Sequence, residues 1–379
     1  MLLHRLSTGT RRRPAIDPIM SADDASTLKR LRDAIALHFD PQRGAPFWLS
    51  RASRWSFDPR TVIRTVEDLS RIEMIQPADL ARTAIEDLLP APAGERRAHL
   101  MIAQTGGTTG QPVWTAYAPD EFDEAFVTPF VAAARHVGFP FGGNWLYVGP
   151  SGPHIIARAA DAIARSTGSM PPFSVDFDPR WAAKLPEGSF AAQRYLHHLV
   201  DQATAVLKTQ SITTLFSTPI VVKALSEALS PHERIRITGI HYGGMALPSA
   251  ELDKLQTEAF PNAVHLSGYG NTLFGCCLEL TAAAHRELSY YPHGDRIILG
   301  TIDDTDPARR RACYDRSSRT GQLVFSRLDS TVLLLNIVER DRVRICNPPL
   351  DAPPGFRLPG AAGPVPIRDH RARTGIGLY

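Results

Sequence analysis

The chain has 379 residues, enough for two or three compact units at about 150 residues per domain. Hydrophobic residues make up 43% of it and charged residues 21%, which excludes the compositions of disordered and fibrous proteins. The 42 basic and 39 acidic side chains leave a net charge of only +3, which argues against a nucleic-acid partner, although Arg triplets at 11–13 and 309–311 keep that alternative open.

The first twenty residues are polar and Arg-rich, so we expect a mobile arm at 1–20. It lacks the apolar centre of a signal peptide, and no stretch of the chain approaches the ~20 apolar residues of a membrane span. We therefore expect a cytoplasmic protein with no membrane partner. Helical patterns follow at 25–39, 59–72 and 77–89, and a Pro/Gly-rich break at 90–94 precedes a short strand at 99–103.

Helix-period and strand-like segments alternate from residue 120 onward. Helices are expected at 120–137, 154–166, 191–207, 219–229 and 248–260. Strands are expected at 145–148, 212–217, 235–242 and 263–266. This alternation predicts an α/β core over residues 21–275 with a largely parallel sheet, whose ligands bind at the carboxyl ends of the strands.

After residue 275 the pattern changes to short β-like runs without a convincing helix between them. These runs lie at 276–280, 288–291, 296–302, 322–326 and 332–338. They predict a smaller β-rich unit, antiparallel or barrel-like, over residues 276–345. The remaining stretch, 346–379, is dense in Pro and Gly, and we expect irregular structure there.

A Gly- and Thr-rich segment at 104–112 follows the short strand and reads Gln-Thr-Gly-Gly-Thr-Thr-Gly-Gln-Pro. Glycines let a phosphate oxygen approach successive backbone N–H groups, and Thr105, Thr108 and Thr109 add hydroxyl donors. The segment is not a Walker loop, because Gly110 is followed by Gln111 and no lysine. It predicts phosphate binding, with an ordinary Gly/Thr turn as the alternative.

This segment resembles the phosphate loop of the adenylate-forming superfamily (acyl-CoA synthetases, peptide-synthetase adenylation domains and luciferases), usually written Ser-Gly-Thr-Thr-Gly-x-Pro-Lys. Residues 241–246 resemble its Gly-Gly-Glu turn, residues 267–272 its aromatic-Gly-x-Thr-Glu turn, and residues 320–326 its Gly-Glu-Leu-Val stretch, all in the family's order. Residues 46–69 resemble the phenylacetate:CoA ligase branch. The likeness covers roughly residues 40–345.

The resemblance implies a large adenylation domain with mostly parallel sheets and a small β-barrel-like subdomain. It also implies ATP-dependent conversion of a carboxylic acid into an acyl-adenylate with release of pyrophosphate. Thr108 and Thr272 would act on the phosphates as catalytic residues. Nucleotide-binding residues by family position are Thr105, Gly106, Gly107, Thr109, Gly110, Gly243, Gly244, Met245, Ala246, Tyr269, Gly270, Asn271 and Asp341. The acid pocket by family position comprises Tyr147, Ser151, His154, Thr218 and Gly268.

Within that resemblance, Tyr269 and Gly244 would flank adenine and Asp341 would bind the ribose hydroxyls. The sequence departs from the family at Leu273, where a glutamate normally helps to hold Mg²⁺. The phosphates alone, or Glu279, would then coordinate the metal. A capping or packing role is the alternative to ligand binding for His154. For Tyr147, Thr218 and Met245 the alternative is packing in the core.

The family's C-terminal domain, which carries a catalytic lysine, has no counterpart after Asp341, so we expect no thioester step by this chain alone. Its short plan resembles a phenylacetate:CoA ligase-like protein of phenazine antibiotic biosynthesis, which implies an aromatic acid such as griseoluteic acid. A downstream reductase or acyl-acceptor protein is the expected partner, and a homodimer is left open. The competing hypotheses are a nucleotide- or aryl-acid-binding protein with little catalysis, and an acyl-CoA ligase that needs a partner domain.

Two clusters of reactive side chains are given no functional role. No Cys-x-x-Cys pair is present, so buried free thiols are favoured over a zinc site that would use His285 or His293. The thiols in question are Cys276, Cys277, Cys313 and Cys346. Asp303 and Asp304 are explained by a solvated turn.

Overall fold

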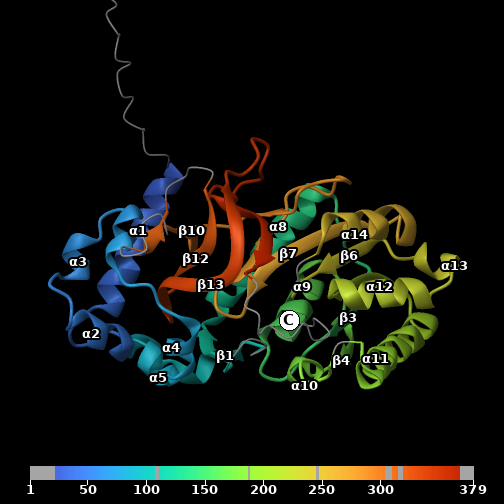
Figure 1. Cartoon of the computed structure of the whole chain (residues 1–379), viewed down its shortest axis with the longest axis horizontal. Helices are drawn as coiled ribbons and strands as arrows, with labels where there is room; N and C mark the ends of the chain where they lie inside the picture. The colour runs from blue at the N-terminus through green and yellow to red at the C-terminus, as the bar shows by residue number, and fades with distance from the viewer. Residues whose placement is uncertain are drawn as a thin grey trace, which may run out of the picture.

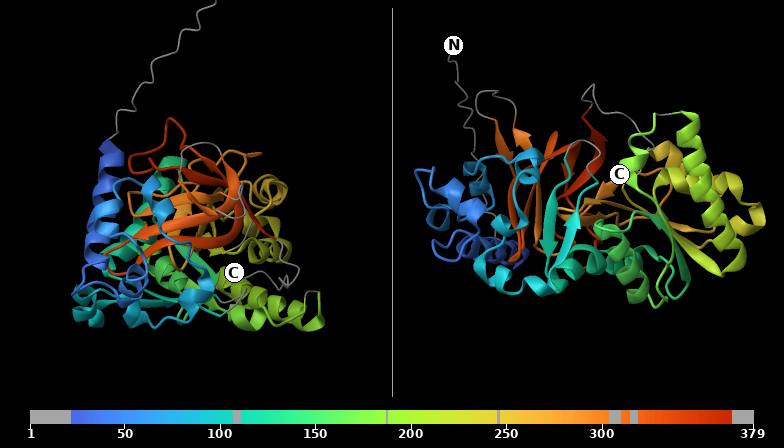
Figure 2. Two further views of the ribbon diagram at one scale, coloured as in Figure 1. Left: turned by 60° about the vertical axis from the view of Figure 1, so that its left-hand side comes forward. Right: turned by 90° about the horizontal axis from the view of Figure 1, so that it is seen from below.

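The computed structural model describes residues 22–106, 111–186, 188–244, 247–303, 310–314 and 319–367. The arm expected at 1–20 and the end of the expected irregular tail, 368–379, lie outside these ranges. Two sheets form the centre of the structure, with helices around them (Figure 1). Seen from below, the N-terminal helices lie beside one sheet and the longer helices of the middle of the chain beside the other (Figure 2).

The first sheet contains β3 (Asn144–Gly149), β4 (Phe173–Asp176), β5 (Ile212–Ser217), β6 (Gly239–Tyr242), β7 (Val264–Asn271) and β8 (Gly275–Leu278). Its order is β4-β3-β5-β6-β7-β8, in which the first five strands are parallel and β8 pairs antiparallel with β7. The largely parallel sheet expected from the sequence is therefore confirmed.

Helices cover both faces of this sheet, because alternate side chains of a strand point to opposite sides. Leu146 and Val148 of β3 pack into the cluster that contains α11 (Phe190–Thr209) and α12 (Pro219–Ala228). Trp145 and Tyr147 pack into a second cluster, with α8 (Thr128–Val137) and α9 (Ile155–Ser166). The remaining helical elements here are α7 (Pro119–Phe122), η3 (Asp123–Val127), α10 (Pro179–Ala182), α13 (Pro231–Arg234), α14 (Ser249–Lys254) and η4 (Leu255–Ala259).

The second sheet is antiparallel throughout. Its strands are β9 (Ser289–Tyr290), β10 (Ile297–Asp303), β11 (Arg311–Cys313), β12 (Thr320–Leu328), β13 (Leu333–Cys346) and β14 (Gly360–Pro366), in the order β11-β10-β12-β13-β14-β9. A bridge between Leu278 and Tyr291 connects it to the first sheet. Strand β14 lies in a stretch that we expected to be irregular, because its small Gly and Ala residues show no strand pattern although Ala361 and Ala362 are buried.

The N-terminal helices lie beside the second sheet, where some of them contact β12 and β13. They are α1 (Ala22–His38), α2 (Pro46–Ala52), α3 (Pro59–Val62), α4 (Pro77–Ala81), α5 (Ile85–Leu88) and α6 (Ala91–Glu95), with 3₁₀ turns η1 (Glu67–Arg71) and η2 (Arg97–His99). Trp48 donates its indole N–H to the Leu333 carbonyl at 2.9 Å. Asn336, at a φ of 53° that asparagine tolerates, donates to the carbonyls of Leu69 and Ile72.

Three local predictions in this region were wrong. The single helix expected at 77–89 is divided into α4 and α5, because α4 ends at Arg82 and a new helix begins after Ala84. The continuous helix expected at 59–72 is interrupted, because the Asp68 carboxylate accepts the backbone N–H groups of Arg64 at 3.0 Å and Thr65 at 2.9 Å, which fixes a turn. The break expected at 90–94 contains α6 instead, since Pro92 lies in the first helical turn, where its missing N–H has no partner to lose.

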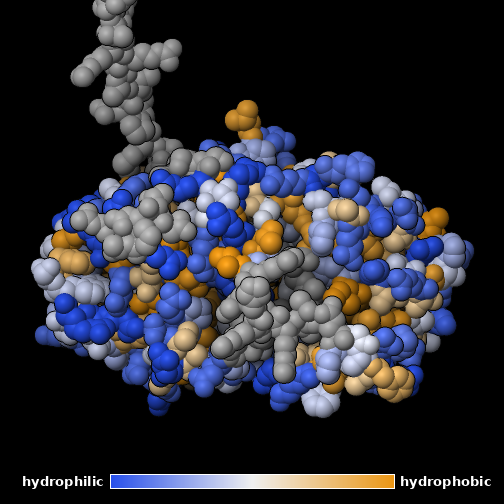
Figure 3. Space-filling view, viewed as in Figure 1, coloured by the Kyte–Doolittle hydropathy of each residue, from blue (hydrophilic) through white to orange (hydrophobic). Residues whose placement is uncertain are grey.

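The short strand expected before the Gly/Thr segment is present as β1 (Met101–Gln104), which forms an antiparallel hairpin with β2 (Trp114–Tyr117). Polar side chains dominate the face drawn in Figure 3, with smaller apolar areas near its middle. None of the helices in the described part of the chain is both long and apolar enough to cross a bilayer.

Candidate functional site

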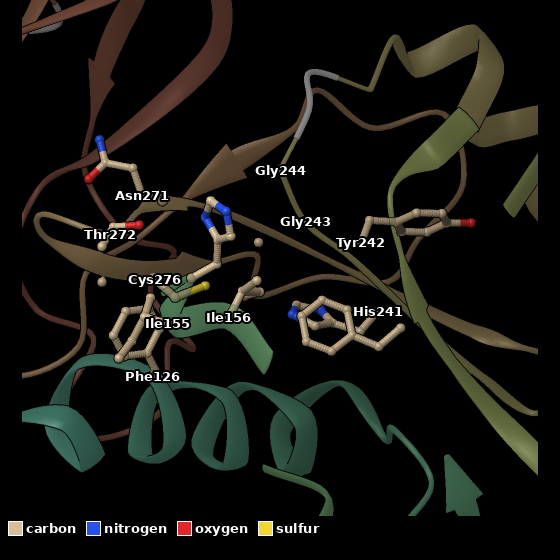
Figure 4. A pocket seen from close by; sticks show the side chains of 15 residues that line it. Phe126, Ile155, Ile156, His241, Tyr242, Gly243, Gly244, Asn271, Thr272 and Cys276 are labelled. Carbon is tan, nitrogen blue, oxygen red and sulfur yellow. The ribbon is translucent and has the colours of Figure 1, made fainter. Parts of the chain in front are cut away.

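A cavity lies where the parallel strands end. Gly243 and Gly244 follow β6 directly, and His154, Ile155 and Ile156 start the helix that follows β3 (Figure 4). Strand β4 lies on one side of β3, and the next strand in the chain, β5, lies on the other side of β3. The direction in which strands are added to the sheet therefore reverses beside this cavity. Such a switch point is where open α/β sheets bind ligands.

The lining includes a set of residues that the sequence assigned to nucleotide or acid binding. They are His154, Gly243, Gly244, Gly268, Gly270, Asn271 and Thr272. It also includes residues that were given no role in nucleotide or acid binding. These are Phe126, Ile155, Ile156, Phe216, His241, Tyr242, Gly275 and Cys276.

Six predicted site residues fall outside the described part of the chain, so their roles stay predictions. They are Gly107, Thr108, Thr109, Gly110, Met245 and Ala246, and the expected solvated turn at Asp304 also lies outside it. The ends of the Gly/Thr loop are described. Thr105 donates its backbone N–H to the Val113 carbonyl at 2.9 Å, and its hydroxyl oxygen accepts the Val113 N–H at 3.0 Å. Thr105 thus closes the loop, and Gly106 follows it.

The base of this loop is tied to two walls of the cavity. Gln104 donates its backbone N–H to the Pro153 carbonyl at 2.8 Å, just before His154. The Thr272 hydroxyl donates to the Gln104 carbonyl at 3.4 Å. The base of the Gly/Thr loop, the start of α9 and the turn after β7 therefore meet at one place.

The turn between β7 and β8 has a fixed shape. The Asn271 amide oxygen accepts the backbone N–H groups of Leu273 at 2.8 Å and Phe274 at 3.2 Å, and its amide nitrogen donates to Glu339. Gly270 is required because a side chain there would collide with the Gly275 carbonyl of the paired strand. Asn271 is one of the residues that line the cavity (Figure 4), and its side chain holds the turn.

Three buried donors bind the carbonyls of the same turn from outside. The Tyr117 hydroxyl donates to the Thr272 carbonyl at 2.8 Å, Arg327 to that of Leu273 at 3.2 Å and Arg296 to that of Phe274 at 2.5 Å. Both guanidinium groups also bind the Asp329 carboxylate, at 2.6 Å from Arg296 and 2.5 Å from Arg327. Although burial opposes ionisation, the two arginines hold the pKa of Asp329 at about 2. This cluster of Arg296, Arg327 and Asp329 positions the turn.

Tyr269 and Asp341, assigned to the same nucleotide site, are joined by a hydrogen bond. The Tyr269 hydroxyl donates to Asp341 Oδ2 at 2.8 Å. Burial, followed by the nearby Asp341 charge, raises the pKa of Tyr269, so the hydroxyl stays protonated as a donor. The Tyr269 ring packs near Tyr290, with ring centroids 5.6 Å apart. Tyr269 therefore anchors Asp341 in this structure.

Much of the cavity lining is apolar. Phe126 enters the cavity from η3, a π-helical segment in the long helix that contains α7 and α8, and Phe216 enters it from β5. His154 is the N-cap residue of α9, and its side chain does not cap the helix. Burial, followed by the charge of Arg180, lowers the pKa of His154. The wall of this region is therefore made of aromatic and aliphatic groups.

Three predicted pocket residues do not contribute to this lining. Tyr147 donates its hydroxyl to the Pro150 carbonyl at 2.9 Å and packs beside Phe216. Ser151 is exposed, and its backbone N–H is bound by Asp176 at 2.8 Å. Thr218 is buried at the start of α12. Their proposed contacts with an acid stay predictions.

The described residues do not fit an Mg²⁺ site at the turn after β7. The Leu273 side chain is 4% exposed and packs in the core, where it offers no oxygen. Glu279, the alternative ligand, binds Arg286 with both oxygens, at 2.8 and 3.0 Å, and also accepts the Ser267 N–H at 3.0 Å. Across the described ranges, no three His, Cys, Asp or Glu side chains gather closely enough to hold a metal ion.

Glu279→Gln is therefore expected to act on stability and not on metal binding. It would leave the Arg286 charge buried without its partner and lower the free energy of unfolding by about 3 kcal/mol. Urea unfolding measures this, with Glu287→Gln at a more exposed Arg344 pair as the control, expected within about 1 kcal/mol of wild type. If Mg²⁺ instead stabilised the wild type but not Glu279→Gln, the structural role would be contradicted.

Comparison with protein-family models gave no match, and no curated protein matches the chain. Solved structures do match. One is 2-hydroxyisobutyryl-CoA ligase in complex with 2-HIB-AMP and CoA in the thioesterification state, with 17% identity and a TM-score of 0.65 over 89% of this chain and 66% of that one. Another is the same ligase in the postadenylation state with R3-HIB-AMP, with 16% identity and a TM-score of 0.66 over 92% of this chain and 70% of that one.

The chain thus spans about two thirds of the length of the ligase that it matches. At 16–17% identity this similarity shows the fold, and it carries no residue roles. The mixed α/β fold, with its large parallel sheet covered by helices, is that of the N-terminal domain of an adenylate-forming ligase.

Proposed function

We propose that the protein activates an aromatic carboxylic acid with ATP, forming an acyl-adenylate and releasing pyrophosphate. The observation that carries this proposal is the hydrogen bond from Thr272, in the turn that lines the cavity at the strand ends, to the base of the Gly/Thr loop at Gln104. The Tyr269–Asp341 pair lies beside this turn in the chain, because Tyr269 stands between the lining residues Gly268 and Gly270. The matched ligase, whose structures hold 2-HIB-AMP, supports it through its fold. The acid carboxylate would attack the α-phosphorus in line, so catalysis consists of alignment and charge stabilisation.

Each part of the site has a role in this reaction. The backbone N–H groups of the loop that follows Thr105 bind the β- and γ-phosphates. Thr272, whose hydroxyl lies 3.4 Å from the Gln104 carbonyl, turns that hydroxyl toward the α-phosphate. Tyr269 takes one Asp341 oxygen and leaves the other for a ribose hydroxyl, while Gly244 makes room for adenine. In this proposal neither Leu273 nor Glu279 coordinates Mg²⁺.

The aromatic nature of the acid is supported by the wall of the cavity. Phe126 and Phe216 supply aromatic surfaces, and Ile155 and Ile156 supply aliphatic ones. A planar ring can pack between such groups with offset or edge-to-face geometry. Resemblance in sequence and plan supports a phenylacetate:CoA ligase-like branch and a place in natural-product biosynthesis of the phenazine type. The partner in this setting would be a downstream reductase or acyl-acceptor protein.

ATP–pyrophosphate exchange with aromatic acids tests the proposal, and Asp341→Ala tests the nucleotide site. Loss of charge-assisted hydrogen bonds to ribose is expected to raise the KM for ATP by about 10- to 100-fold. Asp79→Ala, at an ion pair with Arg82 on α4, is the matched control and should leave KM unchanged. Equal KM values for wild type and Asp341→Ala would refute the ribose role.

One observation favours a second function. Leu273 is buried in the core and Glu279 is taken by Arg286, so a nucleotide- or aryl-acid-binding protein with little catalysis fits the same cavity. Binding of ATP and an acid without exchange would select this function. Exchange that continues to a CoA thioester only when a second protein is added would select a ligase that needs a partner domain.

A further inference from the structure

A buried histidine, His241, lies in the wall of the acid cavity (Figure 4). It is 3% exposed and occupies β6, two residues before Gly243. Its ring packs against Phe216 and Phe130, with ring centroids 4.4 and 4.8 Å away. Both of these neighbouring rings are apolar, so the nitrogen atoms of His241 are the polar atoms at this point of the wall.

The hydrogen bonds of His241 define which nitrogen carries the proton. Nδ1 lies 2.9 Å from the Leu266 carbonyl, which only accepts, so Nδ1 is the donor. Burial lowers the pKa of His241 to about 4, so the ring is neutral at pH 7. Nε2 then carries a lone pair, and no group in the described ranges hydrogen-bonds to it. His241 offers the cavity an acceptor.

Space beside this ring depends on Gly268. A Cβ at residue 268 would lie 3.1 Å from His241 Cε1, the carbon between the two nitrogens, and 2.9 Å from Cys276 Sγ. Glycine therefore leaves the ring edge open to a ligand. Cys276 lines the same part of the cavity, and burial raises the pKa of its thiol to about 12, so it stays protonated.

The direction of a bound acid follows from the strand. Gly243 and Gly244 stand at the end of β6, where the phosphates and the acid carboxylate would meet Thr272. His241 lies farther back along the strand, inside the sheet. The ring of an acid that extends from the carboxylate into the cavity would therefore bring its remote end toward His241.

We propose that His241 selects aromatic acids that carry a hydrogen-bond donor, such as a hydroxyl or amino group, remote from the carboxylate. This inference rests on the proposed function, because it places the acid in this cavity. An acid without a donor leaves a desolvated acceptor unpaired, and sites built around such a polar atom discriminate strongly.

The test compares matched probes: benzoic, phenylacetic and cinnamic acids, their 3- and 4-hydroxy derivatives and the O-methyl ethers of these. Binding is measured by calorimetry with the full-length protein, and ATP–pyrophosphate exchange is measured in parallel. Wild type should prefer at least one hydroxy acid over both its parent and its ether by about tenfold. His241→Phe, which fills the space between Phe130 and Phe216 but accepts no hydrogen bond, should reduce that ratio to about twofold or less.

Two further variants separate recognition from shape. His241→Gln provides an amide oxygen and should keep part of the preference, whereas Gly268→Ala, which crowds the ring edge, should weaken it. Cys276→Ala changes the same region without removing the acceptor and should keep the wild-type ratio. If His241→Phe does not fold, the preference ratios of His241→Gln and Gly268→Ala are compared with that of Cys276→Ala. Ratios below that of Cys276→Ala support the acceptor role of His241, and equal ratios overturn it.

The outcomes distinguish this inference from the activation reaction. A preference that follows His241 in binding, without exchange, supports the acceptor and overturns adenylate formation. Exchange with no preference for a donor, or with the same ratio in His241→Phe as in wild type, overturns the inference and leaves the proposed function standing. If none of these acids binds and none supports exchange, both the inference and the proposed function are overturned.

Discussion

Asp329→Ala is expected to lower the free energy of unfolding by about 3–5 kcal/mol. Asp329 is fully buried and is bound by Arg296 and Arg327, which are 2% and 0% exposed, so its removal leaves two buried guanidinium groups without their shared partner. The Arg327 guanidinium also stacks over the Tyr117 ring at 3.8 Å and donates to the Ala116 carbonyl at 2.7 Å, so the change spreads to β2.

The same variant is expected to lose pyrophosphate exchange, because Arg296 and Arg327 hold the carbonyls of the turn that carries Thr272. Urea unfolding and exchange, measured on one preparation, check both effects. Asp295→Ala, which removes a partly exposed partner of Arg30, is the control and should cost about 1 kcal/mol or less. An Asp329→Ala protein as stable as this control would show that the buried cluster does not support the fold.

Acidification from pH 7 to pH 5 is expected to destabilise the protein strongly. Burial lowers the pKa values of His38, His241 and His265 to about 4. In the unfolded chain these groups take up protons near pH 6.5, so between pH 6.5 and pH 4 the unfolded state binds more protons than the folded state. Their stabilising contribution is complete above pH 6.5 and falls by about 2 kcal/mol for each histidine at pH 5.

Urea unfolding at half-unit pH steps measures this loss. Asp329, whose folded pKa of about 2 lies below its unfolded value, adds its own loss only below about pH 4 and does not enter this window. His241→Phe should make the slope between pH 6.5 and pH 5 shallower, although His38 and His265 keep part of it, whereas His232→Gln on the exposed α13 should leave the slope unchanged. A flat profile in wild type would mean that these histidines are not held neutral by burial.

The fold was predictable where periodicity was strong. The alternation that predicted strands at 145–148 and 212–217 with helices around them corresponds to β3, β5, α9 and α11. Strands that depend on pairing were less visible. β7 extends past 266 to Asn271 although Gly268 and Gly270 weaken strand propensity, because Tyr269 and Gly270 pair with Cys277 and Cys276 of β8.

The site was predictable in part for a similar reason. Gly243, Gly244 and Thr272 belong to turns whose composition and order carry a family pattern, and the structure brings them to one cavity. Phe126 carries no such pattern, and His241, although it begins the segment 241–246 that resembles the Gly-Gly-Glu turn, was given no role of its own. Phe126 reaches the cavity because a π-helical turn interrupts a helix that the sequence presents as continuous, and His241 lies in a strand whose sequence reads as ordinary core.

Sequence reasoning also separated groups that the structure joins. Tyr269 and Asp341 were assigned different tasks, adenine contact and ribose binding, yet one hydrogen bond links their side chains. Glu279 was considered as a metal ligand, yet Arg286 and Ser267 occupy its oxygens. Both relations depend on side chains that meet across strands, which spacing along the chain does not reveal.

Transfer of an isotope from the acid to AMP tests adenylate formation directly. A preferred aromatic acid, labelled with ¹⁸O in its carboxylate, is incubated with ATP and Mg²⁺, and hydroxylamine is added to capture the acyl group. Attack of the carboxylate on the α-phosphorus predicts one ¹⁸O atom in the AMP released and none in pyrophosphate. Cleavage of ATP to ADP and phosphate, label in a phosphate other than that of AMP, or no acid-dependent AMP would contradict the proposed activation.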